Sequence, residues 1–143
     1  MIKNQLEQKQ LTLKYKTDKS EHHYVFADKM MVETIIRNLL SNAIKFSYPN
    51  GIIELNVSES ESEKQYQISI IDHGIGIKPE IKMKLFTLGN RSSSGTMGET
   101  GIGLGLRICK DLTEFNHGKI SVLSESGQGS TFSFTLDKFI NQK

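Results

Sequence analysis

Residues 37–47 read RNLLSNAIKFS, which has the pattern of a helix interior yet carries two asparagines four residues apart. Asparagine is less favourable than alanine in a helix by roughly 0.5 kcal/mol per residue, so its repeated use needs a reason. The apolar residues of this region recur at the helical period: Val32, Ile35, Ile36, Leu39, Leu40 and Ala43. They predict a long helix from about Lys29 to Phe46, with Asp28 as its N-cap.

Asn38, Asn42 and Lys45 form one polar stripe on that helix. At about 100° per residue, Asn42 lies about 40° and Lys45 about −20° from Asn38, while the apolar residues centre about 120° away. The stripe therefore borders the core, where an unpaired amide would cost about 1–3 kcal/mol. Two interpretations remain open. These are polar boundary residues bonded to a neighbouring loop, or they form a ligand site, because amide oxygens suit Mg²⁺ and a lysine suits phosphate.

The rest of the chain predicts strands and shorter helices. Apolar patterns predict strands over residues 11–17, 22–28, 52–58, 65–72, 119–126 and 130–137. Shorter helices are expected over 79–88, which begins with proline, and over 104–115, which ends at the sequence NHG. Between them, residues 89–101 are rich in Gly, Ser and Thr and predict a mobile loop. The pattern favours an α+β sandwich with the helices on one face of the sheet.

Composition restricts the class of protein. The chain has 143 residues, 36% hydrophobic and 24% charged, which is typical of one soluble globular domain. The net charge of +2 is too small to indicate nucleic acid or an anionic membrane as a partner. The single cysteine, Cys109, excludes an internal disulfide and suits the core of a protein in a reducing compartment. Without a long apolar run or a signal peptide we expect a cytoplasmic location, which leaves open a membrane anchor in a longer parent protein.

Three glycine-containing stretches are candidates for binding a nucleotide: DHGIGI (72–77), GIGLGL (101–106) and GQGSTF (127–132). Glycine lets the backbone approach a ligand closely, and the free N–H groups of a helix N-terminus bind anions. Asp72, at a predicted strand end, can accept a hydrogen bond from an amino group such as that of adenine. Taken singly, DHGIG and GQGS are also explained as turns, whereas three glycines at a helix start are costly without a ligand. The chain contains neither a P-loop nor the dinucleotide-binding fingerprint.

In order and spacing, NLLSNAIKFS, DHGIGI, LF, GIGLGL and GQGSTF resemble the ATP-binding catalytic domain of sensor histidine kinases, a branch of the GHKL superfamily. The resemblance covers roughly residues 11–138. It implies a two-layer α/β sandwich, with a mixed sheet of about five strands, about three helices on one face and a flexible lid over ATP. It places residues 11–143 in the catalytic domain, and residues 1–10 in a linker or the end of a helix from an upstream dimerisation domain.

The resemblance also implies roles for individual residues. Asn42 corresponds to the Mg²⁺ ligand, with Asn38 beside it, and Lys45 corresponds to a phosphate contact, so these three form the expected catalytic group. Asp72 corresponds to the acid that binds the adenine amino group. The other residues expected at the ATP site belong to the adenine pocket, the foot of the lid, the lid, the phosphate cradle and the last strand: Gly74, Gly76, Ile77, Phe86, Arg91, Gly101, Gly103, Gly105, Leu106 and Thr131.

Some positions depart from the family pattern. His73 stands where asparagine is frequent, the second aromatic residue usual near Phe86 is missing, and Arg91 is explained equally by a phosphate contact or by a solvated charge. In the hydrolysing branches of the superfamily, a water-activating glutamate stands four residues before the Mg²⁺ asparagine. Here that residue is Asn38, which cannot take a proton, and the missing base removes a factor of about 10²–10⁴ from water attack. The resemblance therefore favours transfer to a protein over hydrolysis.

No histidine of this chain has the setting of a phosphate acceptor. His22, His23, His73 and His117 lie at a predicted strand start or in turns, not on a long helix followed by an acidic residue. We therefore expect a catalytic domain that binds ATP and Mg²⁺ but needs a separate dimerisation domain to complete phosphotransfer, with a response regulator downstream. A hydrolysing GHKL ATPase and a non-catalytic nucleotide-binding module remain as alternatives.

Overall fold

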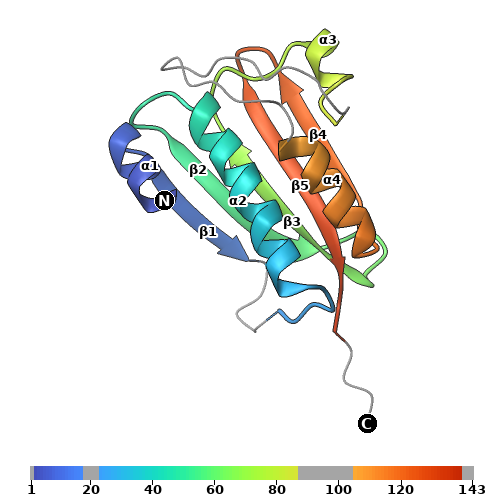
Figure 1. The fold of residues 1–143 in the computed structure, drawn as a ribbon. Helices are drawn as coiled ribbons and strands as arrows, with labels where there is room; N and C mark the ends of the chain where they lie inside the picture. Colours follow the sequence, from blue (N-terminus) through green and yellow to red (C-terminus); the bar gives the residue numbers. More distant parts are fainter. Residues whose placement is uncertain (1, 18–22, 87–104, 140–143) are drawn as a thin grey trace.

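The chain folds into one layer of strands that helices cover on one face (Figure 1). The computed structural model of the chain describes residues 2–17, 23–86 and 105–139. In chain order its elements are α1 (Ile2–Lys9), β1 (Thr12–Thr17), α2 (Lys29–Phe46), β2 (Ile52–Glu59), β3 (Gln65–Asp72), α3 (Pro79–Lys82), α4 (Gly105–Phe115), β4 (Ile120–Glu125) and β5 (Gly129–Asp137). Helices α1, α2 and α4 lie on the same face of the sheet (Figure 1), so the predicted two-layer arrangement is confirmed.

The five strands form a mixed sheet in the order β1-β2-β3-β5-β4. β1 runs parallel to β2, since helix α2 returns the chain across the sheet between them, and the other neighbouring pairs are antiparallel. The predicted hairpins are present as β2–β3 and β4–β5. The register sets Asp72, the last residue of β3, opposite Ser130 at the start of β5. One end of the sheet therefore carries both the end of β3 and the β4–β5 turn.

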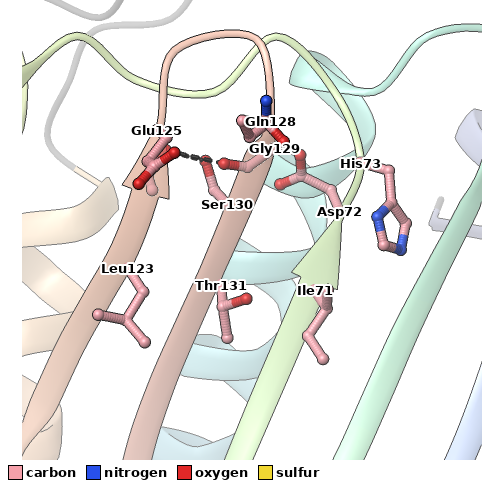
Figure 2. A pocket seen from close by; sticks show the side chains of 10 residues that line it. Ile71, Asp72, His73, Leu123, Glu125, Gln128, Gly129, Ser130 and Thr131 are labelled. Atoms are coloured by element: carbon pink, nitrogen blue, oxygen red, sulfur yellow. Dashed lines mark hydrogen bonds between the residues drawn. The ribbon is translucent and has the colours of Figure 1, made fainter.

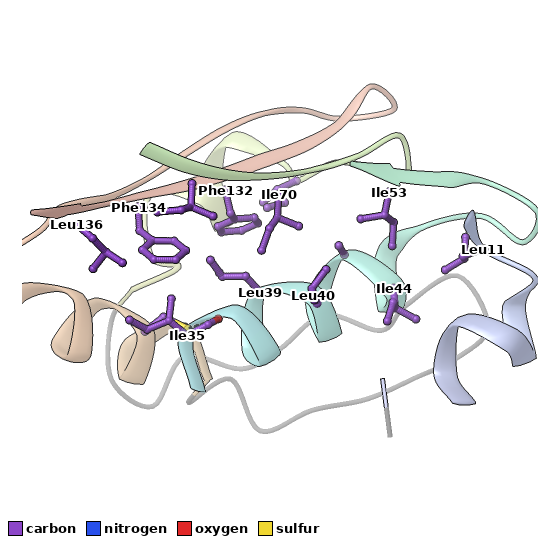
Figure 3. Close-up of a cluster of buried hydrophobic side chains, with 14 residues drawn as sticks. Leu11, Ile35, Leu39, Leu40, Ile44, Ile53, Ile70, Phe132, Phe134 and Leu136 are labelled. Atoms are coloured by element: carbon purple, nitrogen blue, oxygen red, sulfur yellow. Dashed lines mark hydrogen bonds between the residues drawn. The ribbon is translucent and has the colours of Figure 1, made fainter. Parts of the chain in front are cut away.

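The buried face of α2 forms the centre of the core (Figure 3). Ile35 and Leu39 have no exposed surface, and Leu40 and Ile44 continue the same face toward the end of the helix. Alternate residues of three strands form the sheet side of this core: Ile53, Ile68, Ile70, Phe132, Phe134 and Leu136. The apolar residues that follow the helical period and those that follow the strand period therefore pack together in one hydrophobic cluster.

The predicted bounds of α2, Lys29–Phe46, are confirmed. At its start, the Asp28 carboxylate accepts a hydrogen bond from the backbone N–H of Met31 at 2.9 Å. At its end, the N–H and the hydroxyl of Ser47 both donate to the carbonyl of Ala43, at 3.0 and 2.6 Å. Local side-chain chemistry therefore sets where this helix begins and ends.

Two predicted elements differ from the structure. The strand predicted over 22–28 is wrong in its described part, because only Val25 forms a bridge, with Lys138 just beyond the end of β5. The helix predicted over 79–88 ends as α3 at Lys82, since the hydrogen bonds tighten from an i−4 to an i−3 pattern at residues 84 and 85. The predicted loop over 89–101 lies outside the described residues. Within the described ranges, no helix combines the length and the hydropathy that a membrane span requires.

Candidate functional site

The C-terminal turn of α2 lies against the DHGIGI loop that follows β3. The N–H of Ile75 donates to the carbonyl of Phe46 at 3.1 Å. A Cβ atom on Gly74 would lie 1.8 Å from that same oxygen, so any side chain at this position would force the loop away from the helix. This close approach brings the helix that carries the polar stripe next to the strand end that carries Asp72.

Asp72 is a buried carboxylate, with 3% of its surface exposed. Its Oδ1 accepts a hydrogen bond from the N–H of Gly74 at 3.0 Å, and the N–H of Ser130 also donates to the carboxylate. Desolvation by burial raises the pKa of Asp72 from 3.8 to about 6, because it outweighs these hydrogen bonds and the nearby His73. The group is therefore ionised at neutral pH yet poorly solvated, which makes it a strong acceptor for an amino group of a ligand.

The β4–β5 hairpin packs against the other side of the DHGIGI loop. Gly76 has a φ of +70°, and a Cβ atom there would lie 2.0 Å from the carbonyl oxygen of Glu125. The N–H of Ile77 donates to the hydroxyl of Ser124 at 2.9 Å. Gly74 and Gly76 thus fit the loop between α2 and the hairpin through backbone contacts that no other residue type would allow.

The structure places Thr131 and its neighbour Ser130 on opposite faces of the sheet. The register pairs Thr131 with Ile71, whereas Ser130 pairs with Asp72. Because successive side chains of a strand point to opposite faces, Thr131 lies with Ile71 on the face of the sheet that carries no helices (Figure 2). The hydroxyl on the side of Asp72 is that of Ser130, which is buried and lies 2.8 Å from the hydroxyl of Ser124. Ser130 is therefore the residue of the GQGSTF stretch that belongs to the candidate site.

A shallow depression of about 280 Å³ lies beside the β4–β5 turn (Figure 2). Ile71, Thr131 and Leu123 line it from three neighbouring strands, and Leu123 is 74% exposed. Their side chains share the face of the sheet opposite to the helices. Asp72 and Ser130 also line this depression, whereas the polar stripe lies on the helix side of the sheet, where we place the candidate site.

The polar stripe of α2 faces the first turn of α4. A Cβ atom on Gly105 would lie 3.6 Å from Oδ1 of Asn38, so the two helices meet at this pair. Desolvation by burial raises the pKa of the Cys109 thiol to about 12, although a hydrogen bond with the Asn38 side chain opposes the shift. Cys109 is therefore a neutral core residue, as predicted, and Asn38 is held between α2 and α4.

Asn42 and Lys45 lie on the last two turns of α2. Asn42 is half-buried, and within residues 2–17, 23–86 and 105–139 its amide has no hydrogen-bond partner. Lys45 is 8% exposed, and its ammonium lies 5.1 Å from the centre of the Phe46 ring. An amide oxygen and a cation thus lie one helical turn apart, on the side of α2 that also carries Asn38.

The donors of the polar stripe fit a Mg²⁺ ion that is bound together with phosphate. Mg²⁺ takes few protein ligands and keeps waters and substrate phosphates, so the amide oxygen of Asn42 is a sufficient protein contribution. Among the residues that the structure describes, no group of three or more His, Cys, Asp or Glu side chains is arranged to hold a metal. A metal in this site would therefore depend on the phosphates of a bound nucleotide.

The remaining predicted site residues fall into two groups. Ile77 is buried in the core, and Phe86 and Leu106 are half-buried against it. The guanidinium of Arg107 donates to the carbonyl of Phe86 at 3.5 Å, which joins the segment after α3 to the start of α4. The others lie outside the described residues, and their roles stay predictions: Arg91, Gly101 and Gly103.

Comparison with known proteins relates this arrangement to one family. The profile described as "Histidine kinase-, DNA gyrase B-, and HSP90-like ATPase" matches residues 27–140. The histidine protein kinase SaeS of Staphylococcus aureus (strain USA300) is 42% identical over 108 residues, which cover 75% of this chain and 31% of that kinase. The chain therefore spans less than a third of the length of the curated relatives it matches.

Two solved structures share the fold. The catalytic domain of histidine kinase ThkA, in a nucleotide-free form, superposes with a TM-score of 0.78 at 26% identity and covers 96% of this chain and 85% of that chain. Full-length ShkA in complex with AMPPNP superposes with a TM-score of 0.76 at 26% identity and covers 94% of this chain and 27% of that chain. Both comparisons span the sheet, α2 and α4 together.

Proposed function

This chain belongs to the family of histidine kinase-, DNA gyrase B- and HSP90-like ATPases, and on that premise we propose that it binds ATP with Mg²⁺ and supplies the γ-phosphate for phosphorylation of a histidine in a separate dimerisation domain of a two-component sensor kinase. The observation that carries the proposal is the position of the Asp72 carboxylate beside the last turn of α2. An acceptor for a purine amino group and a site for phosphate and metal thus lie on adjoining elements.

At the purine end, the ionised carboxylate of Asp72 accepts a hydrogen bond from the exocyclic amino group of adenine. The N–H groups of Gly74 and Ser130 hold the carboxylate in place, so it is oriented before the ligand arrives. The Ser130 hydroxyl lies on the same side of the sheet and offers a second polar contact to the base. Since guanine presents a carbonyl oxygen where adenine has its amino group, this arrangement selects adenine.

At the phosphate end, the residues of the polar stripe place a metal ligand and a positive charge next to the phosphates. A bound Mg²⁺ ion would supply positive charge against the phosphates. The amide oxygen of Asn42 would hold the ion, and Lys45 would add a positive charge one turn further along α2. The N-terminus of α4 at Gly105 directs backbone N–H groups toward the phosphates, and Gly101, Gly103 and Arg91 complete the cradle in this proposal.

The identity and setting of Asn38 support transfer over hydrolysis. An amide cannot take a proton from water, and the Asn38 side chain interacts with the Cys109 thiol on α4, where it opposes the rise in the pKa of that thiol. We assign Asn38 the role of holding the two helices that flank the phosphates at a fixed distance. The nucleophile and any base then come from the histidine-bearing domain, as in phosphoryl transfer that works through positioning and charge neutralisation.

The partners of the chain follow from this role. The proposed phosphate acceptor is a histidine of the dimerisation domain of the parent kinase, and a response regulator then takes the phosphate from it. We propose residues 11–143 as the catalytic domain and residues 1–10 as its connection to that dimerisation domain. The domain would work on the cytoplasmic side, with any membrane anchor elsewhere in the parent protein.

Titration of this chain with ATP, with and without Mg²⁺, tests the proposal. We expect saturable binding that Mg²⁺ strengthens, and a weaker affinity in both Asp72→Asn and Asn42→Asp. Leu123→Ala is the matched control, because Leu123 lies on the outer face of the sheet. A folded chain that binds no ATP at millimolar concentration would refute the proposal.

Two further outcomes distinguish the alternatives. Steady phosphate release by this chain alone, abolished by Asn38→Ala, would make it a hydrolysing ATPase. If the parent protein binds ATP but never labels a histidine with radioactive γ-phosphate, the domain is a nucleotide-binding module without transfer activity. Labelling of a histidine that requires Asn42 would support the kinase.

A further inference from the structure

Lys9, the last residue of α1, sends its ammonium into the end of α2. Lys9 is 4% exposed, and its Nζ donates to the carbonyl oxygens of Ile44 at 2.7 Å, Lys45 at 2.9 Å and Ser47 at 2.9 Å. An ammonium has three N–H donors, and three carbonyls lie within hydrogen-bond range of them. A buried charge of this kind is held only where its donors are satisfied, so the position of Lys9 and that of the helix end depend on each other.

The acceptors of Lys9 belong to the turn that carries the proposed phosphate contacts. The last four carbonyls of a helix lack partners within the helix, and together they form the negative end of its dipole. Two neighbouring carbonyls of this turn are bonded by local groups, Ala43 by Ser47 and Phe46 by Ile75. The Ile44 carbonyl accepts from the N–H of Ser47 at 3.4 Å as well as from Lys9, and the carbonyl of Lys45 itself is another acceptor of Lys9.

The backbone of Lys9 holds the turn that follows α2. Its carbonyl accepts a hydrogen bond from the N–H of Asn50 at 2.9 Å, and Gln10 then turns the chain with a φ of +55°. The N–H of Thr12 donates to the carbonyl of Gly51 at 3.0 Å, so the start of β1 is bonded to the same turn. Lys9 thus contacts α2 and the turn that follows it, through its side chain and its backbone respectively.

The purine end of the site is held by a different set of bonds. The Asp72 carboxylate is fixed by the N–H groups of Gly74 and Ser130, and the β3–β5 register fixes the strands that carry it. Within the described residues, the hydrogen bonds to this carboxylate come from Gly74 and Ser130 and not from α1. A change at Lys9 should therefore reach the phosphate end of the site before it reaches the purine end.

We infer that Lys9 is a positioning residue for the phosphate end of the nucleotide site, which fixes the last turn of α2 so that Asn42 and Lys45 face the phosphates and their Mg²⁺ ion. The inference rests on the proposed function, since it needs a nucleotide bound at the candidate site. It adds a residue from α1, a helix that the family profile does not cover, to the residues on which phosphate binding depends. It also gives α1 a route by which a displacement of that helix would change affinity for Mg·ATP.

Two probes separate the two ends of the site in the variant Lys9→Met, which removes the ammonium but keeps most of the side-chain volume. Calorimetry measures the affinity for ATP with Mg²⁺, which depends on both ends of the site. NMR chemical shifts measure the affinity for adenosine, which depends on the purine end alone. We expect the Kd for Mg·ATP to rise on the order of tenfold and the Kd for adenosine to change by less than about twofold. Lys3→Met is the matched control, because it removes the same charge from an exposed position of the same helix.

The outcomes of this experiment are distinct. If Lys9→Met loses affinity for Mg·ATP and for adenosine equally, Lys9 has only a structural role and the inference is overturned. An unchanged affinity for Mg·ATP would also overturn it. If Lys9→Met does not fold, Lys9→Gln keeps an N–H donor at this position and undergoes the same comparison. Unfolding of both, with Lys3→Met folded, would also overturn the inference. A wild-type chain that binds adenosine but not Mg·ATP, or neither, would refute the proposed function itself.

Discussion

The two ends of the proposed ATP site relate stability to binding in opposite ways. At the phosphate end, the bonds that position the ligand contacts also cap α2, because Lys9, Ser47 and Ile75 satisfy the carbonyls of its last turn. At the purine end, the group that would bind the ligand is a buried carboxylate whose pKa burial raises to about 6. The bonds that position the proposed phosphate contacts therefore stabilise the fold, whereas the proposed purine acceptor destabilises the fold at neutral pH.

The largest effect is expected where the two ends meet, at Gly74. Gly74→Ala would place a Cβ atom 1.8 Å from the carbonyl oxygen of Phe46, so either the loop or the helix end must move. We expect a loss of about 3 kcal/mol or more in the free energy of unfolding, measured by urea denaturation, together with loss of ATP binding.

Gly127→Ala is the control for Gly74→Ala. A Cβ atom on Gly127 would meet no heavy atom within 4 Å, although its φ of +82° is unfavourable for alanine. Only the conformational term then remains, about 1–2 kcal/mol, and ATP affinity should be nearly unchanged. Equal losses in the two variants would show that the contact between the loop and α2 is not what sets the structure of the site.

Asp72→Asn should separate binding from stability at the purine end. The amide keeps one oxygen to accept from the surrounding N–H groups but removes a poorly solvated charge. We expect affinity for ATP to fall by about 10²-fold, while the free energy of unfolding at pH 7.5 rises by about 1–3 kcal/mol. Urea denaturation and nucleotide titration of the same preparations test this. A variant that is less stable and still binds ATP would contradict both halves of the comparison.

In the wild-type chain, the free energy of unfolding and the affinity for ATP should change in opposite directions with pH. Since the pKa of Asp72 is raised from 3.8 to about 6, the stability gained by its protonation is fully present below pH 4 and is lost as the pH rises through about 6. Affinity for ATP should run the other way and fall below pH 6, because the protonated carboxyl no longer accepts from the adenine amino group. The difference in unfolding free energy between wild type and Asp72→Asn at pH 5 and pH 7.5 isolates this group from the others. A difference that does not change with pH would exclude Asp72 as its source.

Much of the fold could be predicted because it depends on local signals. The apolar period and the Asp28 cap define α2, and polar turns separate the strands of each hairpin. The prediction of a strand before α2 was wrong for a reason that cannot be seen in the sequence. Residues 24–26 pair with residues 137–139, at the last residue of β5 and just beyond it, where the sheet ends. Strand propensity cannot reveal how far a partner strand extends.

The structure leads us to add two residues to the candidate site, Ser130 and Lys9, and they differ in how far the sequence indicates them. Ser130 could have been found from the sequence, because it is in phase with the core residues Phe132 and Phe134, whereas Thr131 is out of phase. Lys9 could not, since its contacts are with a helix end more than thirty residues away and depend on how α1 packs. The periodicity of a strand or helix lets the sequence predict which residues share a face. The sequence does not predict which residues meet only because two elements pack together.

The smallest expected effect tests that difference between neighbouring residues of β5. Ser130→Ala removes a buried hydroxyl that lies 2.8 Å from Ser124 and on the side of Asp72, so we expect ATP affinity to fall by about three- to tenfold and the free energy of unfolding to fall by about 1 kcal/mol. Thr131→Val keeps the shape of its side chain and removes a hydroxyl from the opposite face, so both quantities should stay within error. Titration of the two variants with ATP compares them directly. A loss of affinity in Thr131→Val with none in Ser130→Ala would mean that the purine lies on the outer face of the sheet, beside the depression next to the β4–β5 turn, and that α2 takes no part in binding it.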